Sequence, residues 1–181
     1  MDLRRIAVVG TCGMGKSTMA RRIGACLDQP YYELDSLYWN PGWEITPEDE
    51  FVRRVESVVS QESWVIDGNY SLARPMIWPR ATTLIWLNYS FPVAFLRLLL
   101  RTIRRGITRA PCCNGNRESL ARAFFHRDSI LLWAITSHPT YNREYPLEIE
   151  RHPHLALVKL RRTKDADAFL ASLVGRRSDR G

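Results

Sequence analysis

GTCGMGKST, from Gly10 to Thr18, is the stretch of sequence from which the fold can be predicted. It matches the spacing G-x-x-x-x-G-K-[ST], follows the apolar run IAVVG, and leads into KSTMARRIGACL, a segment with helical spacing. Its glycines allow a tight turn in which successive backbone N–H groups point inward at phosphate oxygens. The helix N-terminus adds favourable partial charge for an anion. Strand, loop and helix together predict a phosphate-binding loop rather than a chance glycine-rich turn.

The side chains of this loop indicate a site for ATP and Mg²⁺. Lys16 can reach the β- and γ-phosphates as a point charge, and the Ser17 hydroxyl can bind Mg²⁺. Cys12 lies beside the predicted helix N-terminus, where the pKa of a thiol can be lowered, but no base or second thiol is near it in sequence. We therefore interpret Cys12 as a small residue that fills the loop. The predicted nucleotide-binding residues of the loop are Gly10, Thr11, Cys12, Gly13, Met14, Gly15, Lys16, Ser17 and Thr18.

Length and composition set the scale of the protein. The 181 residues, 45% hydrophobic and 25% charged, suffice for one α/β domain over residues 1–181 with a full core. The longest apolar run, FPVAFLRLLL, is too short to span a membrane and contains Arg97. The four cysteines have the spacing of neither zinc ligands nor a disulfide framework, and Met1 is followed almost directly by the first apolar run. We therefore expect a cytoplasmic protein with reduced thiols and no membrane partner.

Apolar runs alternate with helical segments along the chain. The predicted strands are residues 3–10, 30–35, 63–68, 82–88 and 154–160. The predicted helices are residues 16–27, 47–59 (capped by Thr46, with Pro47 in the first position), 91–105, 117–136 and 164–175, with a break and a short further helix before 150 and a frayed tail at 176–181. This alternation predicts a parallel sheet with right-handed crossovers. Residues 106–116, with their Gly, Pro and Asn, predict a mobile insert, which we call the lid insert.

The net charge of +7 is concentrated in one segment. Residues 97–127 contain eight arginines and a single acid, Glu118, which accounts for the whole excess. The arginines at positions 97, 101, 104 and 105 are predicted to lie on neighbouring turns of one helix face. Such a segment can face nucleic acid or a small polyanion such as ATP. No helix-turn-helix, zinc knuckle or stacking platform is readable in the sequence, so the motifs do not favour nucleic acid as the partner.

Four pieces of the chain together resemble a known family. GTCGMGKST, LDSLYWNPGW, WVIDGNY and the arginine-rich helix after the fourth strand are similar to the adenylate-kinase-like P-loop kinases. More narrowly, they resemble the group named DNA topology modulation proteins. The resemblance covers nearly the whole chain. It implies an α/β P-loop NTPase three-layer sandwich: a five-stranded parallel sheet of order 2-3-1-4-5, helices on both faces and an arginine-rich lid.

The resemblance also implies roles for individual acids. Asp67, which closes the third predicted strand, is expected to hold Mg²⁺ with Ser17, a role compatible with an Asp-Gly turn. Asp35, expected at the end of the second strand, either takes the proton of an acceptor hydroxyl as general base or merely caps the following turn. Asn88 stands where related sequences often carry an acid. Because the fourth strand lies on the other side of the first strand from Asp67, we expect this amide to leave the metal unaffected.

The resemblance places arginines over the phosphates. Kinases of this type close an arginine-bearing lid over the transferring phosphoryl group, and Arg101, Arg105 and Arg109 are the expected lid arginines. A solvated basic helix face is the alternative. Arg162 follows the fifth strand, in the loop that packs on adenine in these kinases.

The acceptor is the least defined part of the prediction. Trp39 and Trp43, in the loop SLYWNPGWEI at residues 36–45 (the tryptophan loop), either wall an acceptor pocket or anchor their loop. Arg74 departs from the position that contacts an acceptor phosphate in adenylate kinases, which argues against a nucleoside monophosphate. The predicted function is ATP-dependent phosphoryl transfer to a small-molecule acceptor, nucleoside- or nucleotide-kinase-like, by a monomer or homodimer. The alternative is a regulatory ATPase, or a nucleic-acid-associated protein that affects DNA topology through its basic segment.

Overall fold

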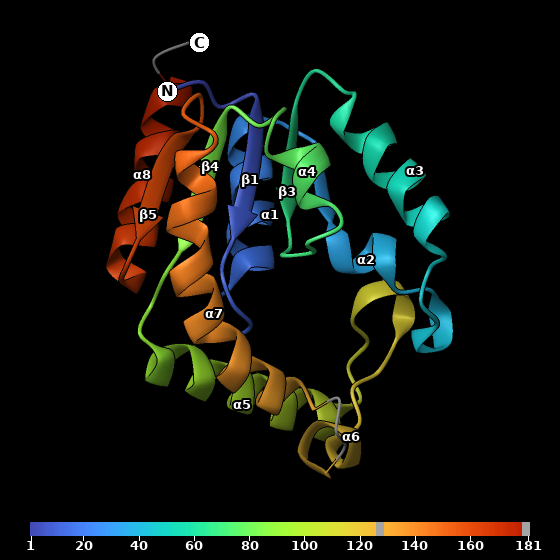
Figure 1. Ribbon diagram of the computed structural model, residues 1–181. Helices are drawn as coiled ribbons and strands as arrows, with labels where there is room; N and C mark the ends of the chain where they lie inside the picture. The colour runs from blue at the N-terminus through green and yellow to red at the C-terminus, as the bar shows by residue number, and fades with distance from the viewer. Residues whose placement is uncertain (126–128, 179–181) are drawn as a thin grey trace.

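A five-stranded, all-parallel sheet forms the centre of the computed structural model, which describes residues 1–125 and 129–178 (Figure 1). The strand order is β2-β3-β1-β4-β5, which confirms the predicted order. The strands are β1 (Arg5–Val9), β2 (Tyr31–Glu33), β3 (Trp64–Asp67), β4 (Thr83–Leu87) and β5 (Ala156–Leu160). The three central strands are buried almost throughout, as is typical of parallel sheets covered on both faces. Because all five strands are parallel, their carboxyl ends meet at one edge of the sheet.

Helices cover both faces of the sheet and complete three layers. One face packs against α2 (Leu34–Tyr38), α3 (Glu48–Val59), α4 (Arg74–Ile77) and α7 (Ile130–Glu150). The other packs against α1 (Lys16–Leu27), α8 (Thr163–Ser178) and the start of α5 (Phe91–Thr108). Figure 1 shows α4 and α7 in front of the sheet and α1 behind it. The short α6 (Leu120–Phe125) and the 3-10 turns η1 (Pro41–Trp43) and η2 (Cys113–Gly115) lie in the connections.

Tertiary packing changes several predicted boundaries in the first half of the chain. The second strand ends at Glu33 and not at Asp35, because Leu34 turns into the core and starts α2. Thr46 is not a helix cap: its hydroxyl donates to the Leu37 carbonyl at 3.0 Å, and α3 begins two residues later. The helix that starts at Phe91 continues through the first residues of the lid insert and ends at Thr108.

The predicted long helix and the break after it are wrong. A separate helix, α7, begins at Ile130 and is capped by Ser129, whose hydroxyl accepts from the Leu132 amide at 3.3 Å. Residues 126–128 lie outside the described residues. It runs without interruption past Pro139 and Pro146. Each proline removes a helical hydrogen bond, and the buried Tyr145, packed on Trp78 and Trp86, offsets that loss. The predicted frayed tail is helical through Ser178, and residues 179–181 lie outside the described part.

Among the described helices, none is long and apolar enough to cross a membrane.

Candidate active site

The phosphate loop leaves the carboxyl end of β1 and enters α1 without a side-chain cap. Gly15 occupies the N-cap position with φ 83° and has no side chain to accept from the first turn. The N–H groups of that turn have no partner within the helix, so they are available to an anion. The Met14 amide donates to the Thr11 carbonyl at 3.4 Å and closes the turn that precedes them. The loop thus leaves the first N–H groups of α1 open at the end of β1, where an anion could be held.

Gly13 and Gly15 have different surroundings, so we predict that substitution by alanine lowers the free energy of unfolding by different amounts at the two positions. Both have positive φ, but a Cβ on Gly13 would overlap the Ala94 carbonyl of α5, whereas nothing lies within 4 Å of a Cβ on Gly15. We expect Gly15→Ala to lower the free energy of unfolding by about 1–2 kcal/mol and Gly13→Ala by at least about 3 kcal/mol. Urea denaturation without nucleotide measures both. Equal losses would mean that the loop moves freely away from α5.

Asn69 was not predicted from sequence. Its side chain connects the start of the phosphate loop to the segment that follows β3. Its side-chain nitrogen donates to the Gly10 carbonyl, and its side-chain oxygen accepts from the Gly10 amide at 3.3 Å. The main-chain contacts of β1 and β3 end nearby, where the Gly68 amide donates to the Val8 carbonyl at 3.4 Å. The Asn69 amide therefore extends the pairing by one step and holds the start of the phosphate loop. Its place directly after Asp67-Gly68 is the sequence signal that could have identified it.

Two carboxylates and a hydroxyl meet at the carboxyl edge of β2 and β3. The Ser17 hydroxyl lies 2.8 Å from Asp67 Oδ2 and 3.2 Å from Glu33 Oε1. Tyr31 donates to Asp67 Oδ1 at 2.8 Å. Asp67 is buried, and this burial raises its pKa to about 6, although the positive charge of Lys16 and the two hydrogen bonds lower it. The cluster is therefore a negatively charged, oxygen-rich site directly beside the phosphate loop.

Glu33, not Asp35, is the acid at the end of the second strand. The register pairs Glu33 with Asp67, so both side chains lie at the same level of the sheet edge. Glu33 is not among the residues predicted from sequence, because the strand was expected to end at Asp35. The signal was present in Tyr31-Tyr32-Glu33, a strand whose last residue is acidic.

Asp35 lies two residues after Glu33, in the first turn of α2, where it is exposed. Tyr70 donates to its Oδ1 at 2.8 Å. Both residues line a large cleft that also contains the phosphate loop. Trp39 and Trp43 also line this cleft, with ring centroids 5.5 Å apart and the planes nearly perpendicular. The tryptophans thus contribute to a wall of the cleft, whereas the neighbouring Tyr38 packs against the core.

A single cleft, with a volume of about 1630 Å³, joins the phosphate loop, the acids and the arginine helix. Of the predicted lid arginines, Arg101 and Arg105 line it. Glu118 lies between them, 2.8 Å from Arg105 and 4.0 Å from Arg101. Arg117 also lines the cleft, although it was not among the predicted lid arginines.

Other predicted residues are not brought to the cleft. Of the described residues that line it, none is Arg109 or Arg162. Arg109 ends α5 in the left-handed conformation and is exposed, and Arg162 pairs with Asp165 at 3.3 Å. Asn88 follows β4, on the opposite side of β1 from Asp67. Its main-chain N–H donates to the Leu160 carbonyl. Cys12 does line the cleft, but burial raises the pKa of its thiol, which favours the loop-filling interpretation over a reactive thiol.

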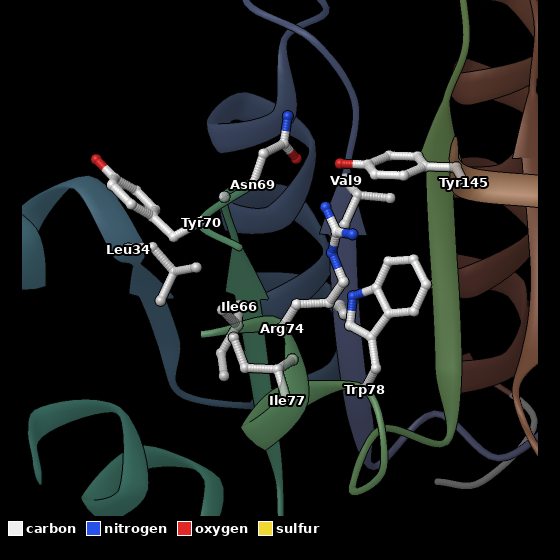
Figure 2. Close-up of a pocket in the computed structure, with 11 residues that line it drawn as sticks. Val9, Leu34, Ile66, Asn69, Tyr70, Arg74, Ile77, Trp78 and Tyr145 are labelled. Atoms are coloured by element: carbon white, nitrogen blue, oxygen red, sulfur yellow. The ribbon is translucent and has the colours of Figure 1, made fainter. Parts of the chain in front are cut away.

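Arg74 lies in a small pocket of about 10 Å³ on the face of the sheet that α4 and α7 cover (Figure 2). Its guanidinium is 5.4 Å from the Trp78 ring centroid and 5.5 Å from that of Tyr145. Within the described residues it has no hydrogen bond or ion pair from its guanidinium. Arg74 is thus held by aromatic faces and does not reach the cleft, which agrees with its departure from the adenylate-kinase pattern.

No family model and no curated protein matches this sequence. Solved structures do match over nearly the full length of both chains. A gluconokinase from Sinorhizobium meliloti 1021 is 18% identical, with a TM-score of 0.53 and coverage of 99% of this chain and 98% of that one. A shikimate kinase from Acinetobacter baumannii, solved in complex with shikimate, is 11% identical, with a TM-score of 0.58 and coverage of 98% and 94%.

A second shikimate kinase, from Bacteroides thetaiotaomicron, is 16% identical, with a TM-score of 0.53 and coverage of 97% and 98%. At these identities the likeness concerns the fold. Combined with the strand order and the phosphate loop, it leads to one conclusion: the chain has the P-loop kinase fold of these small-molecule kinases.

Proposed function

We propose that this protein transfers the γ-phosphoryl group of Mg·ATP to a hydroxyl group of a small-molecule acceptor. One observation carries the proposal: a single cleft joins the uncapped phosphate loop to the carboxylates Glu33, Asp35 and Asp67 and to the arginines of α5. Phosphoryl transfer needs these three components, because catalysis depends on holding the phosphates, positioning the acceptor and neutralising developing charge.

The donor set of the acidic cluster suits Mg²⁺. Ser17, Asp67 and Glu33 offer hydroxyl and carboxylate oxygens, the ligands that Mg²⁺ prefers. Among residues 1–125 and 129–178, no group of three or more His, Cys, Asp or Glu could hold a metal ion by itself. This is the expected arrangement for a Mg²⁺ that takes its other ligands from phosphate and water. When bound, the ion would neutralise phosphate charge; Ser17 and Asp67 would hold it, with Glu33 as a further ligand or a partner of its water.

Asp35 is the proposed general base. Its carboxylate is exposed on the cleft side of α2, and Tyr70 fixes its orientation through one oxygen, which leaves the other free to accept a proton. An acceptor hydroxyl held there would face the phosphate loop across the cleft.

Arg101 and Arg105 are the proposed stabilisers of the transferring group. Two side-chain atoms, Arg101 Nε and Glu118 Oε2, are buried and have no hydrogen-bond partner within the described part of the chain. Leaving such groups unpaired is costly, so a phosphate that accepts from Arg101 would remove one of these costs. Arg109 and Arg162, whose roles the resemblance implies, do not line the cleft and are not part of the proposal.

The acceptor class is a hydroxylated small molecule. The neighbouring structures are named as a gluconokinase and shikimate kinases, and gluconate and shikimate are both hydroxy acids. The narrower resemblance to DNA topology modulation proteins suggests nucleic acid instead. Arg101, Arg105 and Arg117 favour the kinase, because they line the same cleft as the phosphate loop.

A screen of acceptors tests the proposal. We expect ATP consumption by the purified protein, measured as ADP release with Mg²⁺ present, to rise at least about tenfold with one member of a panel of nucleosides, nucleotides, sugars and hydroxy acids, including gluconate and shikimate. Omission of Mg²⁺ should abolish the stimulation. DNA affinity with a steep salt dependence and no acceptor-dependent turnover would support the nucleic-acid alternative. ATP turnover that only a protein partner stimulates would support a regulatory ATPase.

A further inference from the structure

The lid insert forms a compact turn whose tip lies against the tryptophan loop. We call residues 111–117 the lid turn. Pro111 and Arg117 pair across it as an antiparallel bridge, and the Cys112 amide donates to the Asn116 carbonyl at 2.7 Å. In Figure 1 this segment, yellow, reaches from α5 to the connection between α2 and α3. The lid turn therefore has its own structure and is docked on the acceptor side of the cleft.

Five hydrogen bonds join the two segments, which lie more than 70 positions apart in sequence. Asn114 Nδ2 donates to the Ser36 carbonyl at 2.8 Å and to the Trp39 carbonyl at 2.6 Å. Trp43 Nε1 donates to the Arg117 carbonyl at 3.0 Å. Most of these partners are main-chain groups of irregular segments, which need partners once they are withdrawn from water.

Asn116 makes the most specific of these contacts. Its Nδ2 donates to the Asn40 carbonyl and its Oδ1 accepts from the Trp43 amide, each at 2.9 Å. The side-chain amide thereby pairs with the tryptophan loop as a strand neighbour would. Asn116 is only 5% exposed, so the interaction is shielded from competing water.

The contacts in the tryptophan loop divide it into a root and a tip. Arg54 of α3 holds the root, since its guanidinium donates to the Leu37 carbonyl at 2.9 Å and to Asn40 Oδ1 at 3.3 Å. The tip, Pro41–Trp43, has no buried residue. Its tertiary hydrogen bonds within the described residues run from Trp43 to the lid turn. The position of the Trp43 side chain, and so of one cleft wall, depends on the lid turn.

We propose that Asn114 and Asn116 are positioning residues for the acceptor: they hold the tip of the tryptophan loop against the lid turn, so that the acceptor is enclosed between the tryptophans and the arginine-bearing α5. The acceptor role of these residues rests on the proposed function, whereas their contact with the tryptophan loop can be tested without any ligand. Lid closure and acceptor binding are then coupled, because the same hydrogen bonds complete the acceptor wall and dock the lid.

Amide hydrogen exchange of the ligand-free protein, followed residue by residue, tests the contact in Asn116→Ala. The informative group is the main-chain N–H of Asn40, which donates to the Glu44 carbonyl across the base of the tip; Asn116 contacts the carbonyl of Asn40 and not this N–H. We expect its exchange to accelerate at least about tenfold, because release of two hydrogen bonds lets the tip open. The Thr46 amide, bonded at the root to Tyr38, should change little. Acceleration confined to the lid turn would overturn the proposal.

Two further variants control for misfolding and for the substitution itself. Asn114→Ala removes an exposed side chain, so it should fold and still accelerate exchange at the tip. Asn142→Ala makes the same substitution on α7, at a residue that does not line the cleft, and should leave the tip unchanged. Equal acceleration in Asn142→Ala would show a general loss of stability and contradict a specific contact.

Kinetics separate an acceptor role from a merely structural one. With the panel compound that stimulates turnover best, we expect Asn116→Ala to raise KM for that compound at least about tenfold and to leave KM for Mg·ATP within about twofold. An equal rise in both would overturn the assignment to the acceptor. If no panel compound stimulates turnover, the proposed function fails, and hydrogen exchange still decides whether the contact exists.

Discussion

Lys16→Ala is expected to abolish acceptor-dependent phosphoryl transfer while the protein stays folded. Lys16 is half-buried at the first position of α1 and lines the cleft beside Asp67. Within the described residues its ammonium group donates one hydrogen bond, to the Thr11 carbonyl at 3.2 Å, so its charge is available to the phosphates. Loss of a preorganised charge aimed at the reacting phosphoryl group should lower kcat at least about a hundredfold.

Stability should change little in this variant, because alanine is a strong helix former and only one hydrogen bond is lost. The measurements are ADP release with the stimulating acceptor and thermal unfolding followed by circular dichroism. Lys164→Ala is the matched control, since Lys164 is exposed at the start of α8 and does not line the cleft. Unchanged turnover in Lys16→Ala would refute the phosphate-loop assignment.

Asp67→Asn is expected to raise the Mg²⁺ concentration needed for half-maximal turnover at least about tenfold. The carboxylate lies 2.8 Å from the Ser17 hydroxyl, so removal of its charge takes the strongest oxygen ligand from the proposed metal site. Assays should be run well above the pKa of about 6 that burial gives Asp67 in the metal-free protein, because protonation of the wild-type carboxylate would mask the difference.

Asn88→Asp is the informative comparison. It adds a carboxylate at the end of β4, across β1 from Asp67, at a residue that does not line the cleft. The Mg²⁺ dependence should therefore stay within about twofold of the wild type, since the added carboxylate is separated from the proposed ligands by β1 and cannot become one of them. If the two variants exchanged behaviours, the metal would lie on the β4 side and the proposed ligands would be wrong.

The strands and the phosphate loop could be predicted from sequence because both depend on local features, whereas the order of the strands was implied only by the resemblance to the adenylate-kinase-like kinases. GTCGMGKST brings its own glycines, lysine and helix start, and the buried strands are short apolar runs between helical segments. The place of Asp67 at the end of a strand could also be read locally, since it ends such a run and is followed by glycine, but its proposed metal role came from the resemblance.

Other parts of the site depend on contacts between distant segments. The end of β2 at Glu33 is decided by Leu34, which enters the core and starts a helix, and no local pattern distinguishes it from a strand residue. Helix α7 continues through Pro139 and Pro146 because packing of Tyr145 compensates for the lost hydrogen bonds.

The sequence by itself determined the strand and helix pattern and the phosphate loop, because each of those depends on spacing within a short segment, and the resemblance implied the order of the strands. Only the tertiary structure decided the acceptor end. There, Asn116 and Asn114 satisfy main-chain groups more than 70 residues away, and Asp35, Tyr70 and the tryptophans are brought together by pairing that no local pattern encodes. Hydrogen bonds between irregular segments have no periodicity, so they can be identified only once the chain is folded.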